Sequence, residues 1–318
     1  MPPPANDSGW PELPYAAWKD TYATLHLWTQ IVGKLRLKLT PWLNHSWHVT
    51  LYVTPRGLST GPMPLTGGRD LAIDFDFIDH VLWLRASDGE FRQVMLRPTT
   101  VAEFHGEVMN ALAALGVAVR INEMPCEIEN AVRFSEDRAH SSYDADFANR
   151  HFRVLAATQR VLAHFRTGFL GKASPVHFFW GSFDLAVTRF SGRNAPLLKA
   201  SGRPGLSLAV AREAYSHEVS SAGFWPGDDT IAYPAYYSYA YPEPEGFAAA
   251  KVRPAAAFYS EDYGQFLLPY DAVRKAADPE ATLMEFLKST YEAAADLGKW
   301  DRKALDCVLG EIGKVRPT

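Results

Sequence analysis

Apolar and polar residues alternate along this chain with two different periods. Between Tyr15 and Val32, large apolar side chains recur every three or four residues, which predicts an amphipathic helix. The next residues, Lys34–Leu39, alternate strictly between charged and apolar side chains, a pattern typical of a strand with one face in solvent. We therefore expect Gly33 to end the helix and a strand to follow it at once.

The rest of the pattern indicates several short strands and two more helices. Strands are expected at residues 47–53, 71–77, 81–86, 91–96 and 117–121. Thr99 or Thr100 can cap a helix after the fourth of these strands, and Gly116 can end it. A further long helix is expected near residues 145–171, whereas residues 222–227, which include glycine and proline, have the composition of a loop.

Short residue patterns of the first half recur in the second half in the same order. The matched segments are His26–Lys34 with His164–Lys172, Trp47–Arg56 with Trp180–Arg189, and residues 64–65, 91–101 and 111–116 with 196–197, 263–273 and 293–298. Five matches in one order predict an internal duplication. The expected fold class is α+β, with two diverged helix–antiparallel sheet–helix repeats related by a pseudo-twofold axis.

The duplication sets the expected domain boundaries. They are an N-terminal strap at 1–14, repeats at 15–121 and 145–298, a linker at 122–144 and a C-terminal tail at 299–318. Paired repeats leave a cleft between them, and such junctions are favoured ligand sites. The second repeat is the better candidate for the polar groups, because Asp184 lies in an apolar run where an unpaired carboxylate would be costly.

Composition narrows the class of protein. The net charge is −4 and the isoelectric point is near 6.2, without a basic block, which argues against a nucleic-acid partner. The two cysteines, Cys126 and Cys307, have no metal-type spacing, so we expect reduced thiols in the cytoplasm. The N-terminus lacks a signal-peptide pattern, and every apolar run is far shorter than the roughly 20 residues of a membrane span. We expect a soluble protein without a cofactor.

Several long blocks of this sequence resemble a bacterial family classed as a domain of unknown function. The blocks are NHSWHVTLYV at 44–53 with RGL at 56–58, SPVHFFWGSFDLAVTRFSGR at 174–193, and the segment 215–227. The similarity extends over nearly the whole chain. Because the family has no established activity, the resemblance implies kinship and supplies no catalytic residues.

The residue types of the second repeat favour an acid–base pocket in the cleft. The expected catalytic residues are His177, His217, Glu218 and Asp184. The expected ligand-binding residues are Trp180, Arg189, Phe224, Trp225, Trp47 and Arg56. Arg189 is expected to bind an anionic group or to pair with Asp184, Glu218 to orient a histidine, and the aromatic side chains to exclude water. The competing interpretation is that these polar side chains join loops through hydrogen bonds, as most charged residues do.

Other chemistries have less support. His45 and His48 are the candidates for a metal site, but residues three apart on a strand point to opposite faces, so we expect no metal. Ser182 lacks the second glycine of an esterase elbow, and the Gly171-Lys172 pair lacks the spacing of a phosphate-binding loop. The tyrosines at 237, 239 and 241 share one face of a strand and are expected to pack within the protein.

Three functions remain open on this evidence. The first is small-molecule binding in the cleft, with acid–base catalysis as its extension. The second is a non-catalytic interaction protein that forms a homodimer. The third is a histidine-ligated metalloenzyme.

Overall fold

The computed structural model describes residues 9–202 and 204–316 of the 318-residue chain. The first half contains α1 (Tyr15–Leu39), the 3-10 helix η1 (Asn44–Ser46), β1 (Tyr52–Val53), β2 (Gly57–Ser59), β3 (Met63–Pro64), β4 (Asp70–Asp76), β5 (Val81–Ala86), β6 (Phe91–Met95) and α2 (Val101–Ala114). These strands form an antiparallel sheet in the order β1-β2-β4-β5-β6, with β3 paired to β4. The sheet is a meander in which neighbours in sequence are neighbours in space.

The second half begins with the long helix α3 (Ala145–Arg166). It continues with β7 (His177–Phe179), β8 (Asp184–Asn194), α4 (Leu208–Ala214), β9 (His217–Trp225), β10 (Ala235–Tyr241), η2 (Phe247–Ala249), β11 (Phe258–Ser260), β12 (Gln265–Pro269), α5 (Tyr270–Arg274), α6 (Pro279–Leu297) and α7 (Arg302–Leu305). The second sheet is antiparallel, in the order β11-β12-β10-β9-β8-β7. In the part of the chain that the structure describes, no helix is long and apolar enough to cross a lipid bilayer.

Helix α1 is longer than the sequence predicts. It continues through Gly33 to Leu39, so the expected strand at residues 34–39 is wrong. A Cβ at Gly33 would lie 2.3 Å from ring atoms of Trp180, so this glycine allows a tryptophan of the second half to pack on the helix. Leu35 is buried, whereas Leu37 is exposed. The alternation of six residues therefore did not predict the structure here, because the whole segment packs as a helix.

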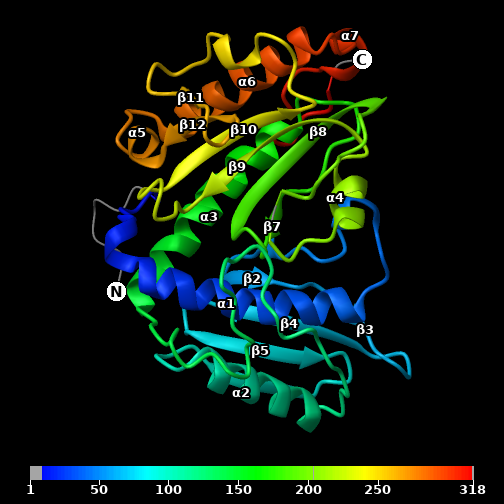
Figure 1. The fold of residues 1–318 in the computed structure, drawn as a ribbon, viewed down its shortest axis with the longest axis vertical. Helices are drawn as coiled ribbons and strands as arrows, with labels where there is room; N and C mark the ends of the chain where they lie inside the picture. The colour runs from blue at the N-terminus through cyan, green and yellow to red at the C-terminus, as the bar shows by residue number, and fades with distance from the viewer. Residues whose placement is uncertain (1–8, 203, 317–318) are drawn as a thin grey trace.

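The two sheets meet at their edges. Leu51, next to β1, and Phe178, in β7, exchange two backbone hydrogen bonds of 2.9 Å. Figure 1 shows the first half below, the second half above, and α1 running across the middle of the view. Because the β1 and β7 edges are joined here, side chains of the turn before β1 lie against the second sheet.

The α+β class with antiparallel sheets is confirmed, whereas the pseudo-twofold axis and the domain boundaries stay predictions. Equal spacing did not place the repeated motifs on equivalent elements. Gly33 lies within α1, whereas Gly171 lies beyond the end of α3. Trp47 precedes β1, whereas Trp180 follows β7. The matches therefore do not by themselves align the two halves.

Other element boundaries also differ from the prediction. Residues 117–121 form no strand, and only 52–53 of the expected strand at 47–53 do so. Residues 222–225, expected in a loop, belong to β9. Of the expected N-terminal strap and C-terminal tail, residues 1–8 and 317–318 lie outside the described residues.

Helices α3 and α6 cover one face of the second sheet. The core on this face includes Leu185 and Val187 of β8, Phe224 of β9 and Tyr236 of β10. Side chains of a strand alternate between its two faces, so Asp184, Ala186 and Thr188 point away from these helices. We call this second surface the open face.

Candidate functional site

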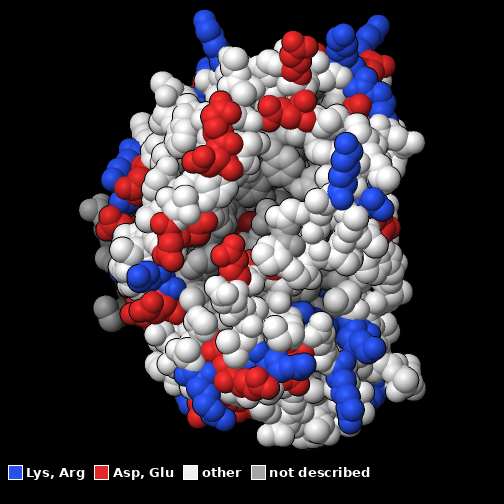
Figure 2. Space-filling view, viewed as in Figure 1, with Lys and Arg blue, Asp and Glu red and all other residues white. Residues whose placement is uncertain are grey.

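The open face of the second sheet has small side chains at its centre. Ala186 of β8 lies opposite Gly223 of β9, and Thr188 lies opposite Ser221. The Thr188 and Ser221 hydroxyls are 2.9 Å apart. Figure 2 shows a hollow in the upper half of the view, over the position of β9 and β10 in Figure 1. The sheet residues at this position are small, and Ala186 and Ser221 are buried beneath larger side chains of the same face.

A tyrosine and a carboxylate share a hydrogen bond on this floor. Tyr237 of β10 lies opposite Gly223, and its hydroxyl donates across β9 to the carboxylate of Asp184. A Cβ at Gly223 would lie 2.2 Å from the Leu185 carbonyl oxygen and 2.6 Å from the Tyr237 hydroxyl. Glycine is therefore the residue that lets the tyrosine ring lie over the strand and reach Asp184.

The electrostatics of this pair fix which group carries the proton. Tyr237 is 8% exposed and Asp184 is 9% exposed. Burial raises the pKa of Tyr237 well above its ordinary value because it disfavours the phenolate, and the charge of Asp184 raises it further. Tyr237 is thus the donor and Asp184 the acceptor. A hydrogen bond to an ionised acceptor is stronger than one between neutral groups.

Aromatic side chains form the walls around the pair. The Tyr239 ring stacks on that of Tyr237, with ring centroids 6.2 Å apart, and its hydroxyl lies 3.0 Å from the Tyr215 hydroxyl. Trp225, at the end of β9, lies 5.7 Å from the Tyr263 ring. The expected wall residue Trp225 therefore lies at the site, although on a strand.

The first half contributes to one rim of the hollow through α1. The Tyr15 hydroxyl donates to Asp229 at 3.1 Å. Burial raises the pKa of Tyr15 to about 12, and the charges of Asp229, Asp228 and Asp20 raise it as well. Acidic side chains gather along the left side of the hollow in Figure 2. The Tyr22 ring centroid lies 5.1 Å from that of Phe183, the residue before Asp184, so α1 lies close to the start of β8.

Trp47 and His177 pack together beside the open face. His177 is on β7 and fully buried, with its ring against Trp47, Tyr52 and Phe179. Burial lowers the pKa of His177 to about 3, and the positive charge of Arg36 lowers it further. The imidazole is therefore neutral near pH 7 and shielded from solvent, which does not favour the proton-transfer role expected for it.

Arg189 lies on the opposite face of the sheet from the hollow. Its separation from Asp184 is an odd number of residues along β8, so the two side chains point to opposite faces and do not pair as expected. The guanidinium lies 3.5 Å from the ring centroid of Phe165 and 4.3 Å from that of Tyr291. Burial lowers its pKa to about 10. Arg189 is a packed residue between α3 and α6.

Two expected wall residues are also core residues. Phe224 points to the helix side, where its ring packs against Tyr236 and Tyr270. Trp180 donates from its indole nitrogen to the Val49 carbonyl oxygen at 2.7 Å while its ring covers Gly33. Both residues stabilise the packing beneath the site and do not line it.

His217 and Glu218 are adjacent on β9 and point to opposite faces, so Glu218 does not orient His217. Instead Glu218 forms an ion pair of 2.6 Å with Arg193, which also donates to the Gly298 carbonyl oxygen at 2.5 Å. His217 Nδ1 lies 3.0 Å from the Ser216 hydroxyl. Glu218 thus joins β8 and β9 to the end of α6.

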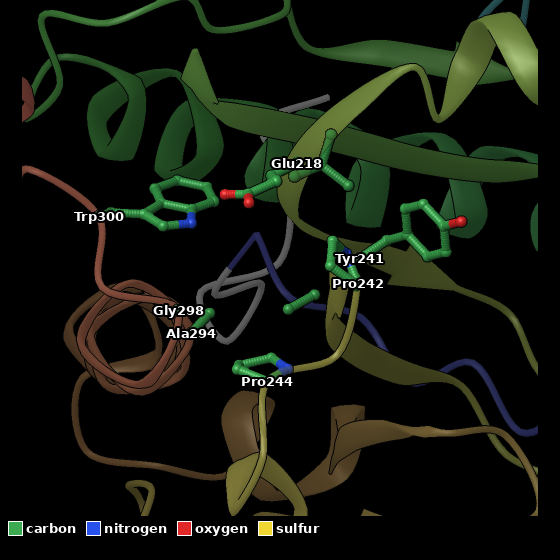
Figure 3. A pocket seen from close by; sticks show the side chains of 9 residues that line it. Glu218, Tyr241, Pro242, Pro244, Ala294, Gly298 and Trp300 are labelled. Carbon is green, nitrogen blue, oxygen red and sulfur yellow. The ribbon is translucent and has the colours of Figure 1, made fainter. Parts of the chain in front are cut away.

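A small cavity lies beside Glu218 on the helix side of the sheet. It measures about 110 Å³ and is bounded by Glu218, Pro242, Pro244, Ala294 and Trp300 (Figure 3). That volume accommodates about three water molecules. The Glu218 carboxylate is already paired with Arg193, so this cavity has little polar chemistry to offer a ligand.

The remaining expected residues lie outside the hollow. Arg56 is half exposed in the turn after β1 and pairs with Asp76 and Asp79. His48 Nδ1 faces the backbone of residue 43, whereas His45 lies against α4 and Lys172. Within residues 9–202 and 204–316, no three His, Cys, Asp or Glu side chains gather in a way that could hold a metal ion.

Three residues of the site were not assigned to it from the sequence. Tyr237 and Tyr239 were expected on one strand face, but their alternation was interpreted as packing. Gly223 was interpreted as a loop glycine. The pairing of β8, β9 and β10 brings these three together, and short-range sequence patterns do not report such pairing.

A tyrosine-walled hollow on one sheet face, with helices packed on the other, defines an α+β protein with a candidate small-molecule site. The chain belongs to a family described as a family of unknown function (DUF5996), whose model matches residues 10–307. Comparison with curated proteins and with solved structures gave no match. This match confirms the resemblance of the chain to a family of unknown function.

Proposed function

We propose that this protein binds a small molecule in the hollow on the open face of the second sheet. The observation that carries the proposal is the Tyr237–Asp184 hydrogen bond, which lies on a floor of small residues and depends on Gly223. A sheet face that served only for packing would be filled by large apolar side chains. Here aromatic walls surround hydroxyl and carboxylate groups, the combination typical of ligand pockets.

The chemistry of the floor favours a ring-shaped ligand that carries hydrogen-bond donors. The rings of Tyr239 and Trp225 offer flat surfaces for stacking. The Asp184 carboxylate and the Thr188 and Ser221 hydroxyls offer acceptors. A buried carboxylate is also the group type used for general base catalysis, so catalysis by Asp184 is an extension of the same proposal.

The test is a thermal-shift screen of ring-containing metabolites with matched variants. Ligands that raise the melting temperature of the wild type are applied to Tyr237→Phe and Trp225→Ala. Tyr236→Phe is the control, because Tyr236 is the neighbouring residue on β10 and points to the helix side. We expect both open-face variants to lose at least half of the ligand-induced shift and the control to retain it. Shifts that are equal in all variants would refute the proposal.

We also propose a cytoplasmic location. Cys126 and Cys307 are both free thiols, which supports a reducing compartment. Cell fractionation with an antibody to the protein tests this, and recovery from a secreted fraction would contradict it.

The alternative proposal is an interaction protein that forms a homodimer through its C-terminal segment. Val308, Ile312 and Val315 are largely exposed there, near the exposed Leu170. Exposed apolar groups that form a contiguous patch mark interaction surfaces. Sedimentation velocity of the wild type and of Ile312→Asp tests it: a dimer that this substitution dissociates would support this alternative.

A further inference from the structure

A basic cluster lies at the end of the open face nearest α4. The Nζ atom of Lys172 is 2.6 Å from Nε2 of His45, and Nδ1 of His45 is 3.1 Å from the Ala214 carbonyl oxygen. A carbonyl oxygen only accepts, so Nδ1 carries the proton and Nε2 accepts from the lysine. The His217 ring lies 6.1 Å from that of His45. Three nitrogen-bearing side chains thus converge on one spot.

Aromatic rings hold the lysine ammonium in place. The Nζ atom lies 4.8 Å from the Phe190 ring centroid and 5.2 Å from that of Trp47. Among residues 9–202 and 204–316, no carboxylate forms an ion pair with Lys172. An ammonium has three donors, and one goes to His45. The lysine is therefore oriented by neutral groups, with donors left for an anion.

The cluster is continuous with the proposed ligand site. Phe190 and Thr188 are both on the open face of β8, two residues apart, a distance of about 7 Å along a strand. His217 points to the same face from the start of β9. Figure 2 shows Lys and Arg side chains on the right of the hollow, opposite its acidic rim. A ligand stacked over Thr188 and Ser221 would extend into the cluster.

We infer that Lys172, His45 and His217 form a subsite for an oxyanion, a phosphate or a carboxylate carried by the ligand. This inference rests on the proposed function and names the charged group of its ligand. Recognition uses the lysine as a positive charge with donors and Nε2 of His217 as a further donor, whereas His45 orients the lysine by accepting one of its hydrogen bonds. The subsite is made of side chains on a sheet and a turn, so it does not require the glycine-rich loop whose spacing this chain lacks.

The experiment titrates the protein with inorganic phosphate and, separately, with acetate at constant ionic strength. Histidine side-chain NMR signals report on the cluster. Lys172→Met keeps a flexible chain against the rings and removes the charge. Lys288→Met is the control, because Lys288 is an exposed lysine on α6, which packs on the other side of the sheet.

We expect saturable shifts of the His45 and His217 signals in the wild type and in Lys288→Met. Lys172→Met should weaken the apparent affinity at least tenfold. The anion that binds with the higher apparent affinity identifies the charged group of the ligand as a phosphate or a carboxylate. Equal responses in Lys172→Met and wild type, or no saturable shift with either anion, would overturn the inference. Should Lys172→Met lose its fold, as seen by circular dichroism, His217→Gln takes its place with the same expected loss.

The two proposals fail in different ways. Tyr237→Phe alters the far end of the face and should leave the phosphate or acetate response unchanged. If metabolite binding proves independent of Tyr237 while the anion still needs Lys172, the subsite stands and the proposed function does not. If metabolites need Tyr237 but neither anion needs Lys172, the reverse holds.

Discussion

The hydroxyl of Tyr237 donates to the Asp184 carboxylate across the full width of β9. The two residues come from strands that are not neighbours, and the strand between them contributes a glycine at the crossing point. The bond therefore depends on the pairing of three strands: β10 supplies the donor, β8 the acceptor and β9 the glycine between them. It also places a carboxylate acceptor among the aromatic side chains of the open face.

Gly223→Ala should disrupt this arrangement. The new Cβ would approach the Leu185 carbonyl oxygen to 2.2 Å and the Tyr237 hydroxyl to 2.6 Å. Overpacking of this kind lowers the free energy of unfolding by about 1–3 kcal/mol. Urea denaturation measures the change. Gly106→Ala is the control, because no atom lies within 4 Å of the added Cβ in α2, and it should raise stability by about 0.5–1 kcal/mol. A neutral Gly223→Ala would show that the strand is free to move.

Tyr237→Phe should remove the hydrogen bond while keeping the ring. Loss of a bond to a charged acceptor costs about 1.5–3 kcal/mol, whereas a bond between neutral groups contributes about 1 kcal/mol. Tyr236→Phe on the same strand removes such a neutral bond, to Thr158 at 3.2 Å. We expect the first variant to be less stable than the second in urea denaturation. Similar losses for both would argue that Asp184 is not an ionised partner of Tyr237.

The predictable parts of this fold are those with strong local signals. Thr100 and Glu103 form the capping box at the start of α2, and the alternating strands β4 to β6 appear where their pattern places them. The extent of α1 was not predictable, because it depends on Trp180 packing over Gly33 from a distant part of the chain. A local pattern carries no information about such a contact.

The candidate site was predictable only in part. Asp184 and Trp225 were both assigned to the site and lie at the hollow: Asp184 is an acidic residue in an apolar run, whereas Trp225 was expected in a loop and instead ends β9. Arg189 and Phe224 do not lie at the hollow, because they point to the helix side of the sheet. Neighbouring residues of a strand point to opposite faces, so a residue cannot be assigned to a face while the strand boundaries are unknown. Lys172 was not assigned to the site, because the residues that it contacts there, Trp47 and His45, come from the turn before β1 in the first half.

Buried histidines should make the protein sensitive to mild acid. His151 is fully buried, its ring stacked on Phe183, and burial lowers its pKa to about 3. The unfolded chain binds a proton near pH 6.5 and the folded chain does not. Stability from this residue is therefore complete above pH 6.5 and is lost as the pH falls toward about 3, by roughly 1.4 kcal/mol per unit. His26 acts in the same direction, with a pKa lowered to about 4.

His151→Phe isolates that effect, because a phenyl ring keeps the stacking and does not titrate. The variant should be at least as stable as the wild type at pH 7.5 and gain about 1.4 kcal/mol relative to it at pH 5.5. Urea denaturation at the two pH values measures the gain. His164→Gln, an exposed position of the same helix, is the control. An unchanged pH dependence in His151→Phe would mean that the buried ring is protonated in the folded state.

Arg189→Met tests whether the arginine of the helix side has any part in binding. Its guanidinium contacts the Phe165 and Tyr291 rings and donates to the Phe165 carbonyl oxygen, so its surroundings are those of a packed side chain. Methionine fills a similar volume without a buried charge, and replacing a buried charged group by a hydrophobic residue of similar volume is often neutral or stabilising. Arg189→Ala should cost about 3–5 kcal/mol, because it leaves a cavity between α3 and α6.

Both Arg189 variants should retain the ligand-induced and phosphate-induced responses of the wild type, since the open face lies on the other side of the sheet. Thermal shift and urea denaturation on the same samples separate stability from binding. If Arg189→Met folds normally and loses the response to every ligand, the binding site lies on the helix side of β8. The Tyr237–Asp184 bond would then serve only to join the strands.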